Sequence, residues 1–85
     1  MKVDFRAIAY QDIDDEVATI DIAKKFGNGI FTLAINIEEH NLSKRIWKDG
    51  EVELTDDEVK IVKKYAPQVF SSYVLSTAII NAVEG

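Results

Sequence analysis

The sequence predicts an α+β domain in which an antiparallel sheet of about three to five strands precedes two helices. Three observations lead to this prediction. Residues 2–10 alternate between apolar and other side chains, Asn-Gly and Asp-Gly pairs lie between short apolar stretches, and residues 66–83 carry no charge. Alternation with period two and these dipeptides are typical of strands and tight hairpins. We therefore expect the two C-terminal helices to pack on one face of the sheet.

Length and composition indicate one small cytoplasmic domain. The chain has 85 residues, so residues 1–85 are expected to form a single domain. Cysteine is absent, which excludes disulfides and thiolate metal sites. A formal net charge of −5 argues against direct binding to nucleic acid, because contact with phosphates needs a basic surface. Charged residues interrupt the first apolar stretch, so we expect no signal peptide and a cytoplasmic location.

The first strand is predicted over residues 2–10, with one buried face. Its side chains point alternately to two sides, and Val3 and Phe5 share the apolar side. Residues 12–16 follow as an acidic connection in which four carboxylates surround Ile13. Their spacing does not match a calcium-binding loop, so we expect a solvated loop at this position.

A β-hairpin is predicted over residues 17–37, with Asn28-Gly29 as a type I′ turn. With that turn, apolar residues face one another at three of four positions on one side. These pairs are Phe26 with Phe31, Ile22 with Ile35, and Ile20 with Ile37. A helix over residues 12–26, capped by Asp12, is the competing interpretation. The β-branched residues favour the strand, and both interpretations stay open.

Residues 38–54 are predicted to form a polar loop and a second, shorter hairpin. The loop covers residues 38–44 and includes His40, which we expect to be a surface residue without a catalytic partner. The hairpin covers residues 45–54, turns at Asp49-Gly50 and places Trp47 opposite Val52. Core packing is the favoured role for this single tryptophan, and an anchor for a partner is the alternative.

Two helices are predicted after Thr55. Thr55 and Glu58 have the spacing of a capping box, which marks the start of the first helix. Pro67 is expected to end it and to begin an uncharged helix over residues 66–83. A membrane span needs about 20 mostly apolar residues, and the polar side chains in this stretch argue against one.

The uncharged helix shows two apolar faces and no charged face. We expect one face to cover the sheet of its own chain and the other to pack on a second subunit, which makes a homodimer the predicted assembly. The candidate interface residues are Trp47, Phe70, Val74, Leu75 and Ile79.

No sequence motif indicates catalysis, so we expect no enzyme, no cofactor and no metal site. The leading hypothesis is a small acidic protein-interaction module that associates with itself through the uncharged helix. The alternative is an acidic inhibitor that blocks the nucleic-acid site of another protein, because clustered carboxylates can imitate a phosphate backbone.

Overall fold

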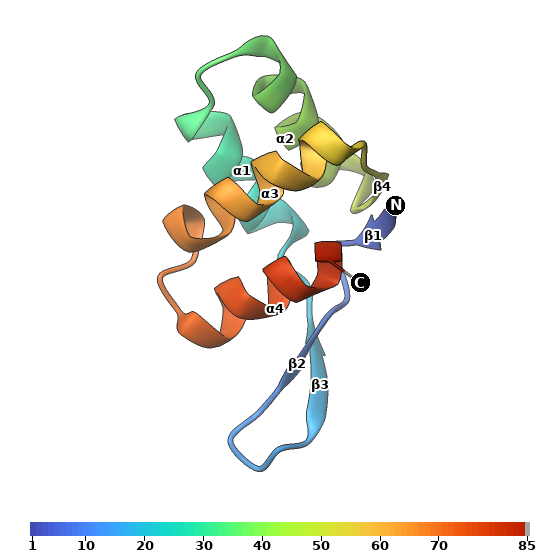
Figure 1. Ribbon diagram of the computed structural model, residues 1–85, viewed down its shortest axis with the longest axis vertical. Coiled ribbons are helices and arrows are strands. Elements are labelled where there is room, and N and C mark those ends of the chain that lie inside the picture. The colour runs from blue at the N-terminus through green and yellow to red at the C-terminus, as the bar shows by residue number, and fades with distance from the viewer. Residues whose placement is uncertain (85) are drawn as a thin grey trace.

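The computed structural model describes residues 1–84, which form an α+β fold with antiparallel strands, as predicted (Figure 1). Eight elements follow one another in the described chain. They are β1 (Lys2–Asp4), β2 (Ile8–Gln11), β3 (Val17–Ile20), α1 (Ala23–Leu33), α2 (Ile37–Asp49), β4 (Glu51–Glu53), α3 (Asp56–Val69) and α4 (Tyr73–Glu84). The described strands form two separate pairs, so the prediction of a single sheet is wrong.

The predicted strand over residues 2–10 is divided by a turn. The Asp4 carboxylate accepts hydrogen bonds from the Arg6 backbone (2.9 Å) and guanidinium (3.0 Å), which bends the chain after β1. Phe5 is buried at this bend, where its N–H donates to the Gly50 carbonyl at 2.8 Å. As a result β1 pairs with β4, whereas β2 forms a hairpin with β3.

The Asn28-Gly29 pair lies inside a helix, so the predicted hairpin over residues 17–37 is wrong. The competing helix over residues 12–26 is also wrong at its start, because residues 17–20 are β3. Both glycines serve helix packing instead of a turn. A Cβ atom at Gly27 would lie 2.7 Å from Trp47 Cβ, and one at Gly29 would lie 2.6 Å from Val69 Cγ1. Glycine lets α1 approach α2 on one side and α3 on the other.

Helix α2 replaces the loop predicted over residues 38–44 and the first half of the hairpin predicted over residues 45–54. Asn36 caps its start, because its side chain accepts a hydrogen bond from Glu39 N at 2.9 Å. Gly50, with φ of +74°, ends the helix and donates to the Ile46 carbonyl. Asp49-Gly50 is therefore a helix end, and β4 pairs with β1 instead of turning back on residues 45–48.

The capping box at Thr55 is confirmed, but the predicted boundary at Pro67 is wrong. Thr55 and Glu58 exchange hydrogen bonds of 3.0 and 3.2 Å. Helix α3 continues through Pro67 to Val69, although proline has no N–H to donate within the helix. The uncharged stretch over residues 66–83 is therefore not one helix. It is divided at residues 70–72, where the extended backbone of Phe70 separates α3 from α4.

The helices enclose one core around three aromatic rings. Phe26 lies between Phe5 and Phe70, with ring centroids 5.7 and 6.0 Å apart. Helix α4 covers part of this core and contacts α3 and β2. Its residues Ile79 and Val83 are buried against its own chain. Within residues 1–84, each helix is too short or too polar to cross a bilayer.

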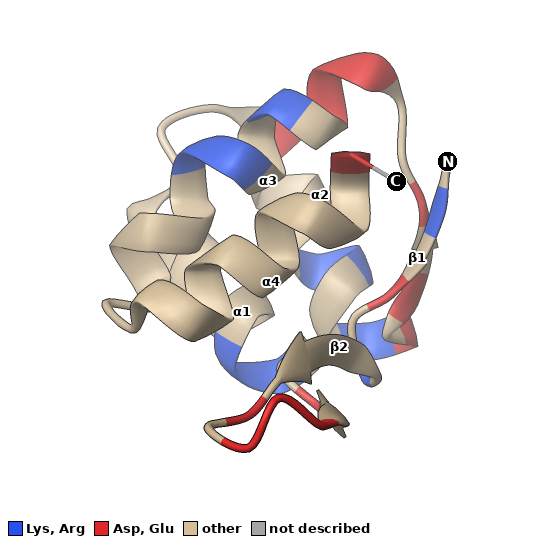
Figure 2. Cartoon of the chain, turned by 60° about the horizontal axis from the view of Figure 1, so that its bottom comes forward, with Lys and Arg blue, Asp and Glu red and all other residues tan. Residues whose placement is uncertain are grey.

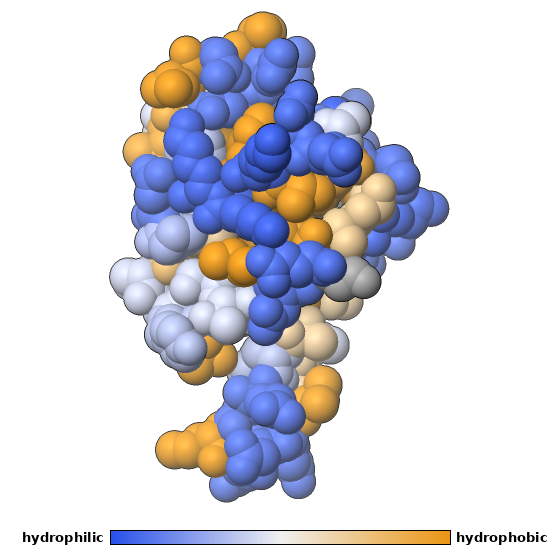
Figure 3. Space-filling model, in the orientation of Figure 1, coloured by the Kyte–Doolittle hydropathy of each residue, from blue (hydrophilic) through white to orange (hydrophobic). Residues whose placement is uncertain are grey.

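The surface carries separate acidic regions and several exposed apolar side chains. Acidic segments lie at the tip of the β2–β3 hairpin, beside β1 and at the start of α3 (Figure 2). Apolar side chains reach solvent at the α1–α2 connection, through Ile35 and Ile37, and at the hairpin tip, through Ile13 (Figure 3). Large exposed apolar side chains of this kind often mark contact surfaces.

Candidate functional site

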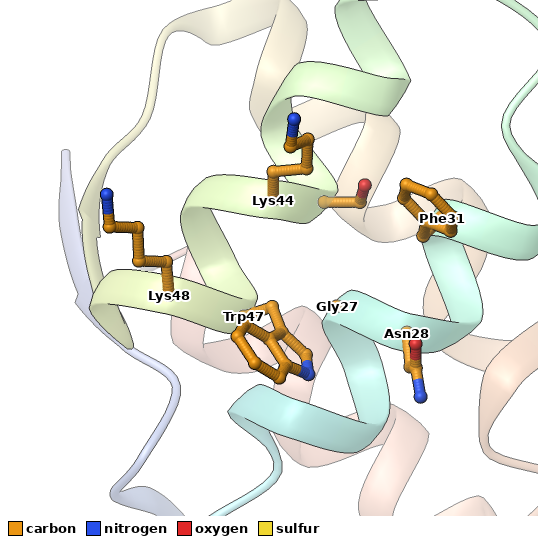
Figure 4. Close-up of a pocket in the computed structure, with 7 residues that line it drawn as sticks. Gly27, Asn28, Phe31, Lys44, Trp47 and Lys48 are labelled. Atoms are coloured by element: carbon orange, nitrogen blue, oxygen red, sulfur yellow. The ribbon is translucent and has the colours of Figure 1, made fainter.

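A groove between α1 and α2 is the best-formed candidate site in the described chain. Its volume is about 310 Å³, and it opens on the outer side of the two helices (Figure 4). We call it the α1–α2 groove, and its lining residues are Gly27, Asn28 and Phe31 from α1 with Ser43, Lys44, Trp47 and Lys48 from α2.

Helical spacing places these side chains. Gly27 and Phe31 are four residues apart on α1, as are Ser43 and Trp47 on α2, so each pair lies on one face of its helix. Gly27 has no side chain and forms the floor, which leaves the two aromatic residues as walls (Figure 4). Glycine at position 27 lets α1 and α2 approach closely at the floor, because a Cβ atom there would lie 2.7 Å from Trp47 Cβ. The groove lies beside this contact, between Phe31 and Trp47.

The walls of the groove are apolar and half-exposed. Trp47 keeps 46% of its surface exposed and Phe31 keeps 49%. Trp47 is therefore not a core residue, so core packing, the role that the sequence favours, is wrong. Tryptophan in a concave, partly apolar surface is the residue type most enriched among binding hot spots.

Lysines surround the aromatic walls. Lys44 and Lys48 lie along the rim on α2, and the Lys24 ammonium lies 3.5 Å from the centre of the Trp47 ring. The ion pairs in the described part of the chain do not include these three lysines. Their charges are therefore free to meet carboxylates of a partner.

The candidate interface residues from the sequence do not share one surface. Phe70 and Ile79 are buried in the core of their own chain, at 4% and 0% exposure, because α4 and the end of α3 fold onto α1 and β2. Leu75 is half-buried, and Val74 lines a second hollow, of about 400 Å³, between α4 and β2. Trp47 alone lies in the α1–α2 groove.

Sequence reasoning missed Phe31 and the lysines at the groove. The signal was present as four-residue spacing, because Lys44 and Lys48 repeat at the same interval as Ser43 and Trp47. That spacing has meaning only on a helix. The predicted hairpins over residues 17–37 and 45–54 place Phe31, Trp47 and Lys48 on strands, and the predicted loop over residues 38–44 leaves Lys44 without a defined face.

A buried carboxylate, Glu39, has a structural role. Its oxygens accept hydrogen bonds from the Tyr65 hydroxyl, from the Lys64 ammonium at 3.0 Å and from the Ile35 backbone at 3.1 Å. Burial acts to raise the pKa of Glu39, but these donors outweigh it and hold the pKa below its ordinary value of 4.5. Glu39 is thus a fixed anion that joins the α1–α2 connection to α3.

His40 belongs to α2 and not to a loop, and its ring lies against Phe31 with centroids 4.9 Å apart. It extends the aromatic wall of the groove at the end nearer the α1–α2 connection. Within residues 1–84, histidine, aspartate and glutamate side chains form no group of three able to hold a metal ion.

Likeness to other proteins adds no further candidate. Comparisons of the chain with protein-family models, with curated proteins and with solved structures give no match. What the groove binds has to be argued from its own shape and charge.

Proposed function

We propose that this chain is a non-catalytic protein-interaction module. Its α1–α2 groove binds an acidic protein segment that presents one large apolar side chain. The observation that carries this proposal is the combination of two half-exposed aromatic walls, Trp47 and Phe31, with three lysines that are not in ion pairs.

The size of the groove supports a single anchoring side chain. Sites for small molecules range over about 300–1,000 Å³, and this groove is at the lower end. Trp47 and Phe31 would contact an apolar guest from two sides, above the floor at Gly27 where α1 and α2 pack closely (Figure 4). Removal of an aliphatic side chain from water into such a place contributes about 1.5–3 kcal/mol.

The charges around the groove support an acidic protein, and not a nucleic acid, as its partner. A phosphate backbone is bound by extended basic surfaces, and this chain has a net charge of −5. Its basic groups near the groove form a local cluster, and acidic segments occupy three other regions (Figure 2). A short acidic segment meets Lys24, Lys44 and Lys48 without approaching those regions.

The alternative function, an acidic inhibitor that blocks the nucleic-acid site of another protein, receives less support from the distribution of carboxylates. Several acidic residues are already in ion pairs, including Glu58 with Arg45 at 2.7 Å and Asp4 with Arg6 at 3.0 Å. The remaining acids are divided among separate regions in Figure 2. Imitation of a phosphate backbone needs a continuous row of negative charge.

The uncharged composition of α4 predicts self-association through this helix, but the burial of its side chains gives that prediction little support. Ala78, Ile79 and Val83 face the core, and the large apolar side chains of α4 that reach solvent are those of the first turn, Tyr73 at 81% and Val74 at 46% exposure. Stable interfaces bury about 800 Å² per partner, which needs more than one helical turn. We therefore propose the α1–α2 groove as the principal contact.

Selection from a displayed random-peptide library tests this function, with Trp47 fluorescence as the readout of binding. We expect peptides in which Asp or Glu flank one large apolar residue. Lys44→Glu should weaken their binding by about tenfold, because it places a like charge on the rim. Lys60→Glu, an exposed lysine on α3, makes the same change in net charge and should leave binding unchanged.

Two outcomes would contradict the proposal. One is the absence of an acidic and apolar consensus among selected peptides. The other is binding of a labelled oligonucleotide that Lys44→Glu abolishes and Lys60→Glu does not, which would make the groove a nucleic-acid site.

A further inference from the structure

The tip of the β2–β3 hairpin has the chemistry that the groove requires. The hairpin extends away from the helices, and its tip is residues 12–16 (Figure 1). Ile13 at this tip is 98% exposed, which is the highest exposure among the large apolar residues of the described chain. Asp14, Asp15 and Glu16 follow it and are also exposed.

The tip is held in one shape before any partner binds. Asp12 Oδ1 accepts hydrogen bonds from the backbone N–H of Asp14 at 2.9 Å and of Glu16 at 3.1 Å. The Asp12 N–H also donates to the Glu16 carbonyl at 2.9 Å, which closes the loop. A segment that is already ordered loses less conformational entropy on binding. The Asp12 carboxylate therefore organises the loop, and three other carboxylates stay available.

We propose that the hairpin tip of one copy of this chain occupies the α1–α2 groove of a second copy, which rests on the groove function proposed above. Ile13 enters between Phe31 and Trp47. The carboxylates at the tip then meet the lysines at the rim. Three exposed acids, Asp14, Asp15 and Glu16, face three lysines, Lys24, Lys44 and Lys48.

The tip of a chain cannot reach the groove of the same chain. Figure 1 shows the hairpin at one end of the long axis, with the α1–α2 connection at the other. The molecule extends 40 Å along this axis, and β2 is fixed by its contacts with α4. The tip could reach its own groove only if the hairpin came apart, so the contact has to form between copies.

This contact is heterologous, because a tip on one copy meets a groove on the next. If the two copies are related by a two-fold axis, each tip enters the other groove and a dimer closes. Otherwise one tip and one groove remain free, and further copies add until a larger ring closes or a filament grows. Such an assembly should weaken as salt is added, because the lysine–carboxylate contacts are screened.

Complementation between two variants tests this arrangement in the full-length chain. Ile13→Ser removes the anchor and keeps the groove. Lys44→Glu/Lys48→Glu reverses the rim and keeps the tip. In sedimentation velocity we expect the average mass of the wild type to increase with concentration. Each variant alone should associate at least about tenfold more weakly than the wild type. Their mixture should form heterodimers and stop there, since only one productive tip–groove contact is possible.

Matched controls separate this contact from general effects. Ile35→Ser removes another isoleucine that is largely exposed, at 77%. Lys60→Glu changes a lysine on α3 that is exposed and outside the ion pairs of the described residues, and it matches the charge change of Lys44→Glu alone. Both control variants should assemble as wild type does, and circular dichroism checks that all variants are folded.

Three results would overturn the inference. They are a wild type that stays monomeric at every concentration, a dimer that Ile13→Ser leaves unchanged, and a mixture that stays monomeric. If selected acidic peptides still bind the groove in any of these cases, the function of the groove stands and only the hairpin as its occupant is rejected.

Discussion

The Lys24 ammonium lies 3.5 Å from the centre of the Trp47 indole ring, which joins α1 to α2 at the edge of the groove. An exposed cation–π contact of this kind contributes about 0.5–1 kcal/mol. It also fixes one rim charge beside the aromatic wall. The contact thus links the stability of the helix pair to the surface that a partner would meet.

Replacing Lys24 with Gln should lower the free energy of unfolding by about 0.5–1 kcal/mol and shift the emission of Trp47, because the cation leaves the ring face. Urea unfolding followed by circular dichroism measures the first effect, and fluorescence of this single tryptophan measures the second. Lys60→Gln is the control, and an equal loss in both variants would contradict a specific contact.

Gly27→Ala should destabilise the protein by about 1–3 kcal/mol, because a Cβ atom there would meet Trp47 and the Ser43 carbonyl at less than 3 Å. The helices would have to separate to make room for the methyl group, and this would change the floor of the groove. Asn28→Ala, the next residue and exposed, should be neutral or slightly stabilising, because alanine favours helix. Thermal unfolding of both variants measures these effects. A Gly27→Ala variant as stable as wild type would show that α1 and α2 are not in close contact at this position.

Replacement of the Glu39 carboxylate should be costly, because three donors converge on it. Glu39→Gln leaves an imperfect acceptor for Tyr65 and Lys64, and we expect a loss of about 1–3 kcal/mol at neutral pH. Glu38→Gln, its exposed neighbour, should cost little. Denaturant unfolding at neutral pH compares the two variants, and equal losses would mean that Glu39 is not the anion holding this connection.

Acid should destabilise the protein through Glu39 and Glu58. Burial acts to raise both pKa values, but hydrogen bonds chiefly from Tyr65 and Arg45 lower them below the ordinary 4.5. Below about pH 4.5 the unfolded chain binds more protons than the folded chain, so stability falls as pH falls through the lowered pKa values. Unfolding free energies measured from neutral to acidic pH should show this slope, and Glu39→Gln should flatten it. An identical slope in that variant would contradict the assignment.

Two residues on α4 test whether this helix packs on its own chain. Ile79→Asp should cost about 4 kcal/mol or more and prevent folding, because an unpaired carboxylate would enter the core. Val74→Asp should change stability by about 1 kcal/mol or less, because Val74 is half-exposed. Soluble yield and circular dichroism distinguish the two. A folded Ile79→Asp variant would show that this side of α4 is not packed in the core, and it would support the helix as a contact surface.

The sequence predicts the class of the fold better than its local elements, for identifiable reasons. The Thr55–Glu58 capping box was read correctly because all its hydrogen bonds lie within four residues. Asn28-Gly29 was misread because the neighbours that require glycine, Trp47 and Val69, are distant in sequence. Period-two alternation over residues 2–10 places Phe5 on the buried side, where it lies, but gives no sign of the turn that divides β1 from β2.

The candidate site was predictable only in part. For Trp47 the sequence favours core packing, with an anchor for a partner as the alternative, and the side chain lies half-exposed in the wall of the groove. The sequence predicts Phe70 and Ile79 at an interface because an uncharged helix of this length has more apolar surface than so small a domain can cover. The corner at residues 70–72 instead folds the stretch back, so its own chain buries both side chains.

Mapping the binding surface by nuclear magnetic resonance tests the central claim most directly. Backbone amide spectra of the ¹⁵N-labelled chain, recorded as a selected acidic peptide is added, report every contacted residue. We predict that the largest shifts fall on Gly27, Lys44 and Trp47, including the indole N–H of Trp47. Shifts that gather instead on Tyr73 and Val74 of α4, with the groove unchanged, would contradict the account.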